Sequence, residues 1–167
     1  MQFLYTNLTN KKEDTIMPKI TKKGNYKFSD DEVYSAYYHM AKFNLSMLKA
    51  FKKADKAGHP SFDENVTNIE EWNELIGKFI LTFQRIVDGY TDSPIALALE
   101  KLRKEHPEYD KFKPIKLENG CYTYAPEKKK LSEQYITADV REAEKAYYSE
   151  IQKNLQLFAK YFTTIWD

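Results

Sequence analysis

Residues 131–167 read LSEQYITADVREAEKAYYSEIQKNLQLFAKYFTTIWD and contain neither glycine nor proline. Apolar side chains recur along this stretch at helical spacings of three, four and seven, so one face is apolar over almost the whole length. The members of that face are Val140, Tyr147, Ile151, Leu155, Phe158, Phe162 and Ile165. Because nothing here breaks a helix, the pattern predicts one continuous helix over residues 131–165, with at most a kink near Thr137, against which shorter helices pack.

A first helix is expected to begin at residues 29–32, where the sequence Ser-Asp-Asp-Glu forms a capping box. The sequence Gly-His-Pro at residues 58–60 is expected to end it. The side chains expected on its inner face are Val33, Tyr37, Met40, Met47, Leu48 and Phe51.

Two further helices follow. The second is expected from about residue 68 to residue 88, with Gly89 where a C-terminal glycine belongs. The third is expected over residues 94–105, because Ser93 is a good capping residue and Pro94 suits the first helical position.

Residues 111–130 break the helical period. The dipeptide Asn119-Gly120 lies between apolar or aromatic arms, which is a strong hairpin signal because glycine supplies a positive φ and asparagine tolerates one. The apolar residues of the two arms are Ile115, Leu117, Tyr122 and Tyr124. We expect the hairpin to lie against the helices, or to gain a third strand from residues 3–6.

These signals together predict an all-α fold: a four-helix bundle-like domain with a long C-terminal helix and a small inserted β-hairpin. Residues 1–27 are expected to form an N-terminal arm and residues 28–167 a single helical domain. Met17 opens a segment that resembles a protein start, so residues 1–16 are expected to be an optional extension.

Composition narrows the classes of function. The 167 residues include 42% apolar and 15% aromatic side chains, which suffices for a hydrophobic core, and the net charge of +1 argues against a general polyanion-binding protein. Cys121 is the only cysteine, so neither an intramolecular disulfide nor a thiolate metal site is expected. No apolar run reaches about 20 residues and no signal peptide is recognisable, so we expect no membrane span and a cytoplasmic location.

The sequence contains no motif that assigns an enzymatic function. Glu70, Glu71 and Glu74 have the E-E-x-x-E spacing with which helical nucleotide phosphohydrolases bind Mg²⁺, but acids in a first helical turn are also favoured by the helix dipole. The three histidines lack the i, i+4 spacing of a helical metal site, and there is no glycine-rich phosphate loop. We therefore assign no catalytic, cofactor-binding or metal-binding residue, and expect no cofactor.

The clearest signal outside the core is a basic stripe on the first helix. Lysines recur there at spacings of seven, four and three, tyrosines extend the same flank, and no acid interrupts the lysines from residue 42 to residue 53. The end of the chain adds aromatic residues beside the apolar face of the last helix. The residues expected to contact a macromolecule are Tyr34, Tyr38, Lys42, Lys49, Lys52, Lys53, Lys56, Tyr161 and Trp166.

Three polar residues intrude on predicted inner faces: Asn44, Glu144 and Asn154. A buried polar side chain needs a hydrogen-bond partner, so these residues either form a structural network or line a small polar site. We favour the structural network.

The leading hypothesis is a non-catalytic helical binding protein whose partner is another protein. Small Lys-rich and Tyr-rich helical proteins of this character occur among phage and mobile-element accessory factors, including inhibitors of host defence systems, an association by general character alone. The alternative is a nucleic-acid-binding accessory subunit that uses the Lys/Tyr stripe. The third hypothesis is an Mg-dependent nucleotide phosphohydrolase; the oligomeric state stays open.

Overall fold

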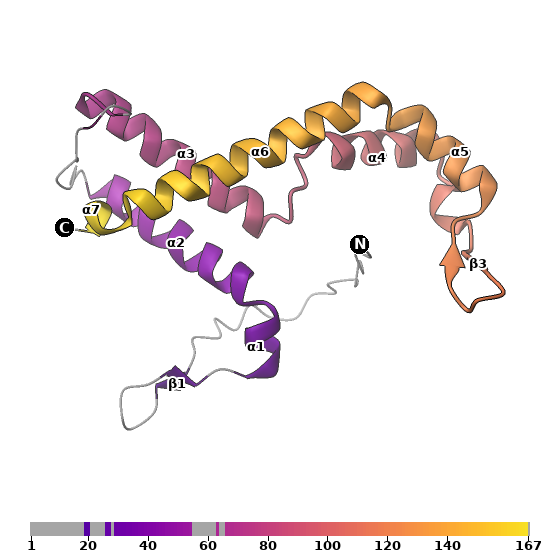
Figure 1. The fold of residues 1–167 in the computed structure, drawn as a ribbon, viewed down its shortest axis with the longest axis horizontal. Coiled ribbons are helices and arrows are strands. Elements are labelled where there is room, and N and C mark those ends of the chain that lie inside the picture. Colours follow the sequence, from indigo (N-terminus) through magenta and orange to yellow (C-terminus); the bar gives the residue numbers. More distant parts are fainter. Residues whose placement is uncertain (1–18, 21–25, 28, 55–62, 64–65, 167) are drawn as a thin grey trace. The chain divides into compact units, whose positions relative to one another are not determined.

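The computed structural model describes residues 19–20, 26–27, 29–54, 63 and 66–166, drawn in colour in Figure 1. The chain divides into two units, residues 1–36 and 37–167. In the first unit, β1 (Lys19–Ile20) pairs antiparallel with β2 (Tyr26–Lys27), and α1 spans Asp30–Tyr34. The expectations for residues 1–16, including the third strand at residues 3–6, lie outside the described residues.

The second unit is mostly helical, which confirms the all-α prediction at this level. Its helices are α2 (Ala36–Lys53, whose first residue belongs to the first unit), α3 (Ile69–Val87), α4 (Pro94–Glu105), the 3₁₀ turn η1 (Tyr109–Lys111), α5 (Pro126–Tyr135), α6 (Ala138–Lys160) and α7 (Phe162–Trp166). The strands are β3 (Ile115–Lys116) and β4 (Tyr122–Thr123).

Helix α3 begins close to the predicted start, and α4 begins with the predicted Ser93 cap. The Asn68 side chain accepts a hydrogen bond from the backbone N–H of Glu71, and the Ser93 hydroxyl accepts one from the N–H of Ala96. After the end of α3, Gly89 adopts a φ of +67°, the left-handed conformation that glycine provides at helix C-termini.

The predicted β-hairpin is confirmed. Strands β3 and β4 pair antiparallel, Gly120 has a φ of +81°, and its N–H donates to the carbonyl of Leu117 at 3.0 Å. Asn119 contributes differently from the prediction, because it is not among the described residues with a positive φ. Instead its side-chain oxygen accepts a hydrogen bond from the N–H of Cys121 at 3.0 Å.

The prediction of one continuous helix over residues 131–165 is wrong. Helix α5 ends at Tyr135 and α6 begins at Ala138, because Thr137 is extended (φ −67°, ψ 174°) and its hydroxyl accepts a hydrogen bond from the Val140 N–H as an N-cap. A second interruption occurs at Tyr161, between α6 and α7. The apolar periodicity continues across Thr137. It therefore did not indicate that the Thr137 side chain caps a new helix there.

Helix α6 packs against both α3 and α4, and Figure 1 shows it running alongside them. Helix α6 runs antiparallel to them, because the residue numbers of the contacting positions on α6 decrease as those on the earlier helices increase. The Asn154 amide donates to the Thr82 hydroxyl at 3.0 Å, and the Ser93 hydroxyl donates to Glu144 at 3.2 Å. Since α3 and α4 use different parts of α6, the finer four-helix bundle arrangement stays a prediction.

Phe158 lies at the centre of the main core. Its ring meets those of Phe79, Phe83 and Phe162 edge to face, at centroid distances of 5.4, 4.8 and 5.6 Å. Edge-to-face pairs at this spacing are favourable beyond the area they bury. The outer ring of the set, Phe162, is 46% exposed, so the prediction that it belongs to the core is wrong. Ile165, three residues further on, is fully buried, so Phe162 lies at the edge of the buried face rather than within it.

The face of α2 that enters the core also differs from the predicted one. The buried residues are Ala41, Leu45 and Leu48, which join the core formed by α3 and α6. The predicted members that are exposed instead are Val33, Tyr37, Met40 and Met47. Apolar residues cover more than one side of this helix. The prediction, which used hydrophobicity alone, therefore assigned the larger side chains to the core, whereas in the structure a narrower row of alanine and leucine packs there.

Candidate macromolecular interface

The predicted lysine stripe lies on α2. Lys49, Lys52 and Lys53 are exposed and Lys42 is half-buried, whereas Lys56 lies outside the described residues. The Lys49 ammonium donates to the side-chain oxygen of Gln84 at 2.7 Å, a neutral partner on α3. Within the described part of the chain, no salt bridge involves any of these four α2 lysines.

Lysines on α4 are in a different environment. Lys104 forms a salt bridge with Glu100 at 2.7 Å, and Lys101 approaches Glu105 at 3.9 Å, both at i, i+4 spacing. Such pairs are typical of a solvated helix face on which charges of both signs alternate. The α2 lysines lack this compensation, so α2 carries a local positive field that the net charge of the chain does not show.

The aromatic residues predicted for the interface fall into different places. Tyr38 is half-buried, and its ring meets the His39 ring edge to face at 5.5 Å. Tyr34 is exposed but belongs to the first unit, and the Trp166 side chain lies outside the described ones.

The expectation that Tyr161 is exposed is wrong. It is 2% exposed, and its ring meets the Trp72 ring edge to face at 5.7 Å. Its hydroxyl bonds both carboxylate oxygens of Asp63, at 2.7 and 2.8 Å, and Lys160 pairs with the same carboxylate at 2.6 Å. Tyr161 is therefore used to bind Asp63 and to pack on Trp72 rather than presented to a partner.

The structure reveals a second exposed surface on α2 that sequence reasoning assigned to the core. Tyr37 and Met40 are each 65% exposed, Phe43 is 59% exposed and Met47 is 40% exposed. Large apolar side chains exposed together on one helix are typical of protein interaction surfaces. The lack of any charged residue among positions 36, 37, 40, 43, 44, 47 and 50 was the available signal.

Two of the three intruding polar residues belong to structural networks. Asn154 is buried and bonds Thr82, whereas the Glu144 carboxylate accepts from the Ser93 hydroxyl and, at 2.9 Å, from the backbone N–H of Ile95. Glu144 thus caps the N-terminus of α4 from a neighbouring helix, where the dipole favours a negative charge. Asn44 is half-buried, and no described residue hydrogen-bonds its side chain.

A polar cluster joins the loop after α3 to α6. The Tyr147 hydroxyl donates to Asp92 at 2.6 Å, Arg85 bonds the other oxygen of that carboxylate at 2.9 Å, and the guanidinium lies 4.7 Å from the centre of the Tyr147 ring. Burial acts to raise the pKa of Asp92, but the hydrogen bonds from Tyr147 and Arg85 outweigh it and leave that pKa below its usual range. Burial, and then the bond to Asp92, raise the pKa of Tyr147 well above its usual range.

The burial and hydrogen bonds of Tyr147 and Tyr161 predict that the folded state loses stability at alkaline pH. Burial and the hydrogen bond to Asp63 likewise raise the pKa of Tyr161. Because the folded state keeps both phenols protonated, their contribution is complete below about pH 10, where unfolded tyrosine ionises, and is lost as the pH rises through the raised values. We expect the free energy of unfolding by urea to fall from about pH 10 upward. The fall should be shallower in Tyr147→Phe, so equal slopes in the two proteins would contradict this assignment.

The acidic motif at the start of α3 serves as a helix cap. One Glu71 carboxylate oxygen accepts from the backbone N–H of Thr67 at 2.7 Å and from its hydroxyl at 2.9 Å. Those hydrogen bonds hold the pKa of Glu71 below its usual range. Among the described residues, no group of three or more His, Cys, Asp or Glu side chains is arranged to bind a metal ion.

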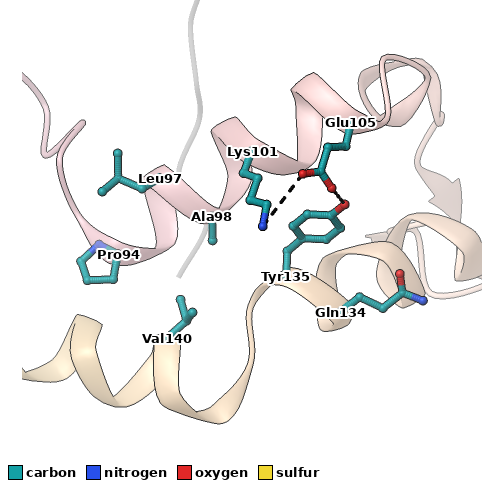
Figure 2. A pocket seen from close by; sticks show the side chains of 8 residues that line it. All are labelled: Pro94, Leu97, Ala98, Lys101, Glu105, Gln134, Tyr135 and Val140. Atoms are coloured by element: carbon teal, nitrogen blue, oxygen red, sulfur yellow. Dashed lines mark hydrogen bonds and ion pairs between the residues drawn. The ribbon is translucent and has the colours of Figure 1, made fainter.

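A shallow groove of about 640 Å³ lies between α4 and the α5–α6 junction (Figure 2). Its floor is largely apolar, formed by Pro94, Leu97, Ala98 and Val140. At one end the Tyr135 hydroxyl bonds the Glu105 carboxylate, which Lys101 also approaches. Tyr135, Glu105 and Lys101 thus interact with one another, whereas Gln134, the remaining polar residue of the lining, has no dashed line to any residue drawn in Figure 2.

Large side chains are also exposed on and next to the β3–β4 hairpin. Tyr122 and Tyr124 are 62% and 68% exposed. The Lys128 ammonium lies 5.6 Å from the Tyr124 ring centre and 4.6 Å from that of buried Tyr109. This contact ties the base of the hairpin to α5 and η1.

None of the described helices is long and apolar enough to cross a membrane. Comparisons of the chain with protein family models, with curated proteins and with solved structures found no match to any of them. The evidence for an interface on α2 therefore comes from the residues of this helix alone.

Proposed function

We propose that this chain is a non-catalytic binding protein that contacts an acidic surface of another macromolecule through the lysines of α2. The observation that carries the proposal is the run of α2 lysines without salt-bridge partners among the described residues. Placing like charges along one flank costs repulsion, which a negatively charged partner would relieve. The lysines concerned are Lys42, Lys49, Lys52 and Lys53.

A protein is the favoured partner. Helix α2 exposes Met40, Phe43 and Met47 as well as the lysines, on the side of the helix opposite Lys42 and Lys49, and large exposed apolar side chains are typical of protein interaction surfaces. A phosphate backbone would use only the lysines, and the chain has just three arginines to support such a contact. In general character such a protein is similar to accessory factors of phages or mobile elements, including inhibitors of host defence. We expect it to act in a reducing compartment such as the cytoplasm.

Reversal of two exposed charges tests the proposal. The partner is first recovered by pull-down from the native host, and its affinity for the wild type and for Lys49→Glu/Lys53→Glu is then measured by titration calorimetry at low salt. We expect affinity to fall by about tenfold or more, because two attractions become repulsions. The melting temperature should change little, since both side chains are exposed.

A matched control is Lys101→Glu/Lys104→Glu, which changes the net charge equally but on α4, where both lysines are paired. We expect this control to bind as the wild type does. Equal loss in both variants would show that overall charge, and not the α2 flank, governs binding.

Nucleic-acid binding is the second candidate, favoured by the same unpaired lysines beside Tyr38. It predicts retention on DNA whose affinity falls steeply with salt, with a log–log slope near −0.9 for each phosphate contact. Retention that is weak and equal for the wild type and the double reversal would leave the protein partner as the only candidate.

A further inference from the structure

Helix α2 carries an uncharged stripe, the α2 apolar face, that consists of the exposed residues Tyr37, Met40, Phe43 and Met47 together with half-buried Asn44. Positions 37, 40, 44 and 47 follow the alternating spacing of three and four that brings side chains to one seam between paired helices. The face is separate from the row formed by Ala41, Leu45 and Leu48, which enters the protein's own core.

Asn44 indicates what kind of partner fits this face. It lies between Met40 and Met47 along the seam, and among the described residues nothing hydrogen-bonds its side chain. An amide both donates and accepts, so an identical amide can accept from its N–H and donate to its carbonyl oxygen at the same time. A single asparagine in the seam of two paired helices is also a recognised means of fixing their register.

The charges on α2 permit such a pairing. At about 100° per residue, Lys42 and Lys49 lie on the side of the helix opposite the α2 apolar face. Two copies that meet through these faces keep their lysines apart, whereas a charged partner would find no complementary charge in the seam. The self-complementary partner is a second copy of the same chain.

We propose that α2 pairs with α2 of a second copy, with Asn44 facing Asn44 across a two-fold axis. In a parallel pair every seam residue meets its own copy, and in an antiparallel pair the residue on the axis does, so Asn44 fits both directions. The proposal does not depend on the function proposed above. The resulting dimer would present a lysine flank on each outer side.

The available surface predicts a reversible dimer. Aromatic side chains expose up to about 150–250 Å² each, so the four partly exposed large side chains supply roughly 400 Å². Stable interfaces bury about 800 Å² on each partner. Self-association should therefore depend on concentration.

Sedimentation equilibrium of the full chain tests the proposal between about 1 µM and about 1 mM, where weak complexes dissociate. We expect a monomer–dimer equilibrium for the wild type and a monomer at every concentration for Met40→Glu/Met47→Glu, because carboxylates in the seam cannot be desolvated. Both positions are exposed in the single chain, so the melting temperature of the dilute variant should be close to that of the wild type.

The matched control is Leu81→Glu/Leu97→Glu, which places the same charges at exposed leucines on α3 and α4. It should dimerise as the wild type does. A wild type that stays monomeric throughout, or a Met40→Glu/Met47→Glu variant that dimerises unchanged, would overturn the proposal and leave the face to another occupant.

Disulfide coupling tests the register. Cys121 is the chain's only cysteine, so Cys121→Ser gives a background in which any coupling reports the added thiol. In that background Asn44→Cys should form a covalent dimer under mild oxidation, whereas exposed Ser46→Cys, on another side of the same helix, should not. Equal coupling at both positions would contradict the proposed register.

Discussion

Replacement of Phe158 by alanine is expected to lower the free energy of unfolding by about 3–5 kcal/mol. The Phe158 ring is 8% exposed and is surrounded by the rings of Phe79, Phe83 and Phe162, so its removal opens a cavity between α3 and α6. A loss of this size should lower the melting temperature by roughly 6–20 °C for a chain of this length.

The control for Phe158→Ala is Phe162→Ala, four residues further on. Phe162 is 46% exposed, so its truncation should cost about 1 kcal/mol or less. The sequence periodicity predicts that Phe158 and Phe162 are both buried in the core. The two thermal melts together therefore test where the core ends. Similar shifts in the two variants would contradict the difference in burial between the two rings.

The second large effect is expected at Tyr161. Tyr161→Ala removes a buried ring packed on Trp72 as well as a hydroxyl bonded to Asp63, so it should cost about 3–5 kcal/mol. Tyr161→Phe removes only the hydroxyl, and should cost about 1.5–3 kcal/mol because the lost hydrogen bond has a charged acceptor. Urea unfolding measures both values.

The pair separates packing from hydrogen bonding. Lys160 still neutralises the Asp63 carboxylate in Tyr161→Phe, so that variant should remain folded. If Tyr161→Ala unfolds at the same urea concentration as the wild type, Tyr161 is a surface residue and the sequence-based prediction of an exposed aromatic end is restored.

Local signals in the sequence predicted much of the fold. Capping by Ser93, the left-handed Gly89 and the turn at Gly120 all depend on a few neighbouring residues, and each is present in the structure. Such features are predictable because the chemistry that creates them lies within one helical turn or one hairpin.

Features that depend on packing were predicted less well. α2 has apolar residues on more than one side, so only contact with α3 could select Leu45 and Leu48 over Met40 and Met47. At Thr137 the sequence predicted at most a kink, whereas the structure ends α5 there, packed against α4, and begins α6. Of the candidate site, the lysines on α2 were found from sequence, whereas the exposed apolar face on the other side of the helix required the structure.

Hydrogen–deuterium exchange of the protein with and without its recovered partner tests the binding role of α2 most directly. We expect binding to slow amide exchange within residues 36–53, where the exposed lysines and apolar side chains lie, while exchange in the β3–β4 hairpin stays unchanged. The comparison is made at a protein concentration at which the free chain has one oligomeric state. Protection confined to the hairpin or to α4, with α2 unaffected, would contradict the proposal that this helix is the binding surface.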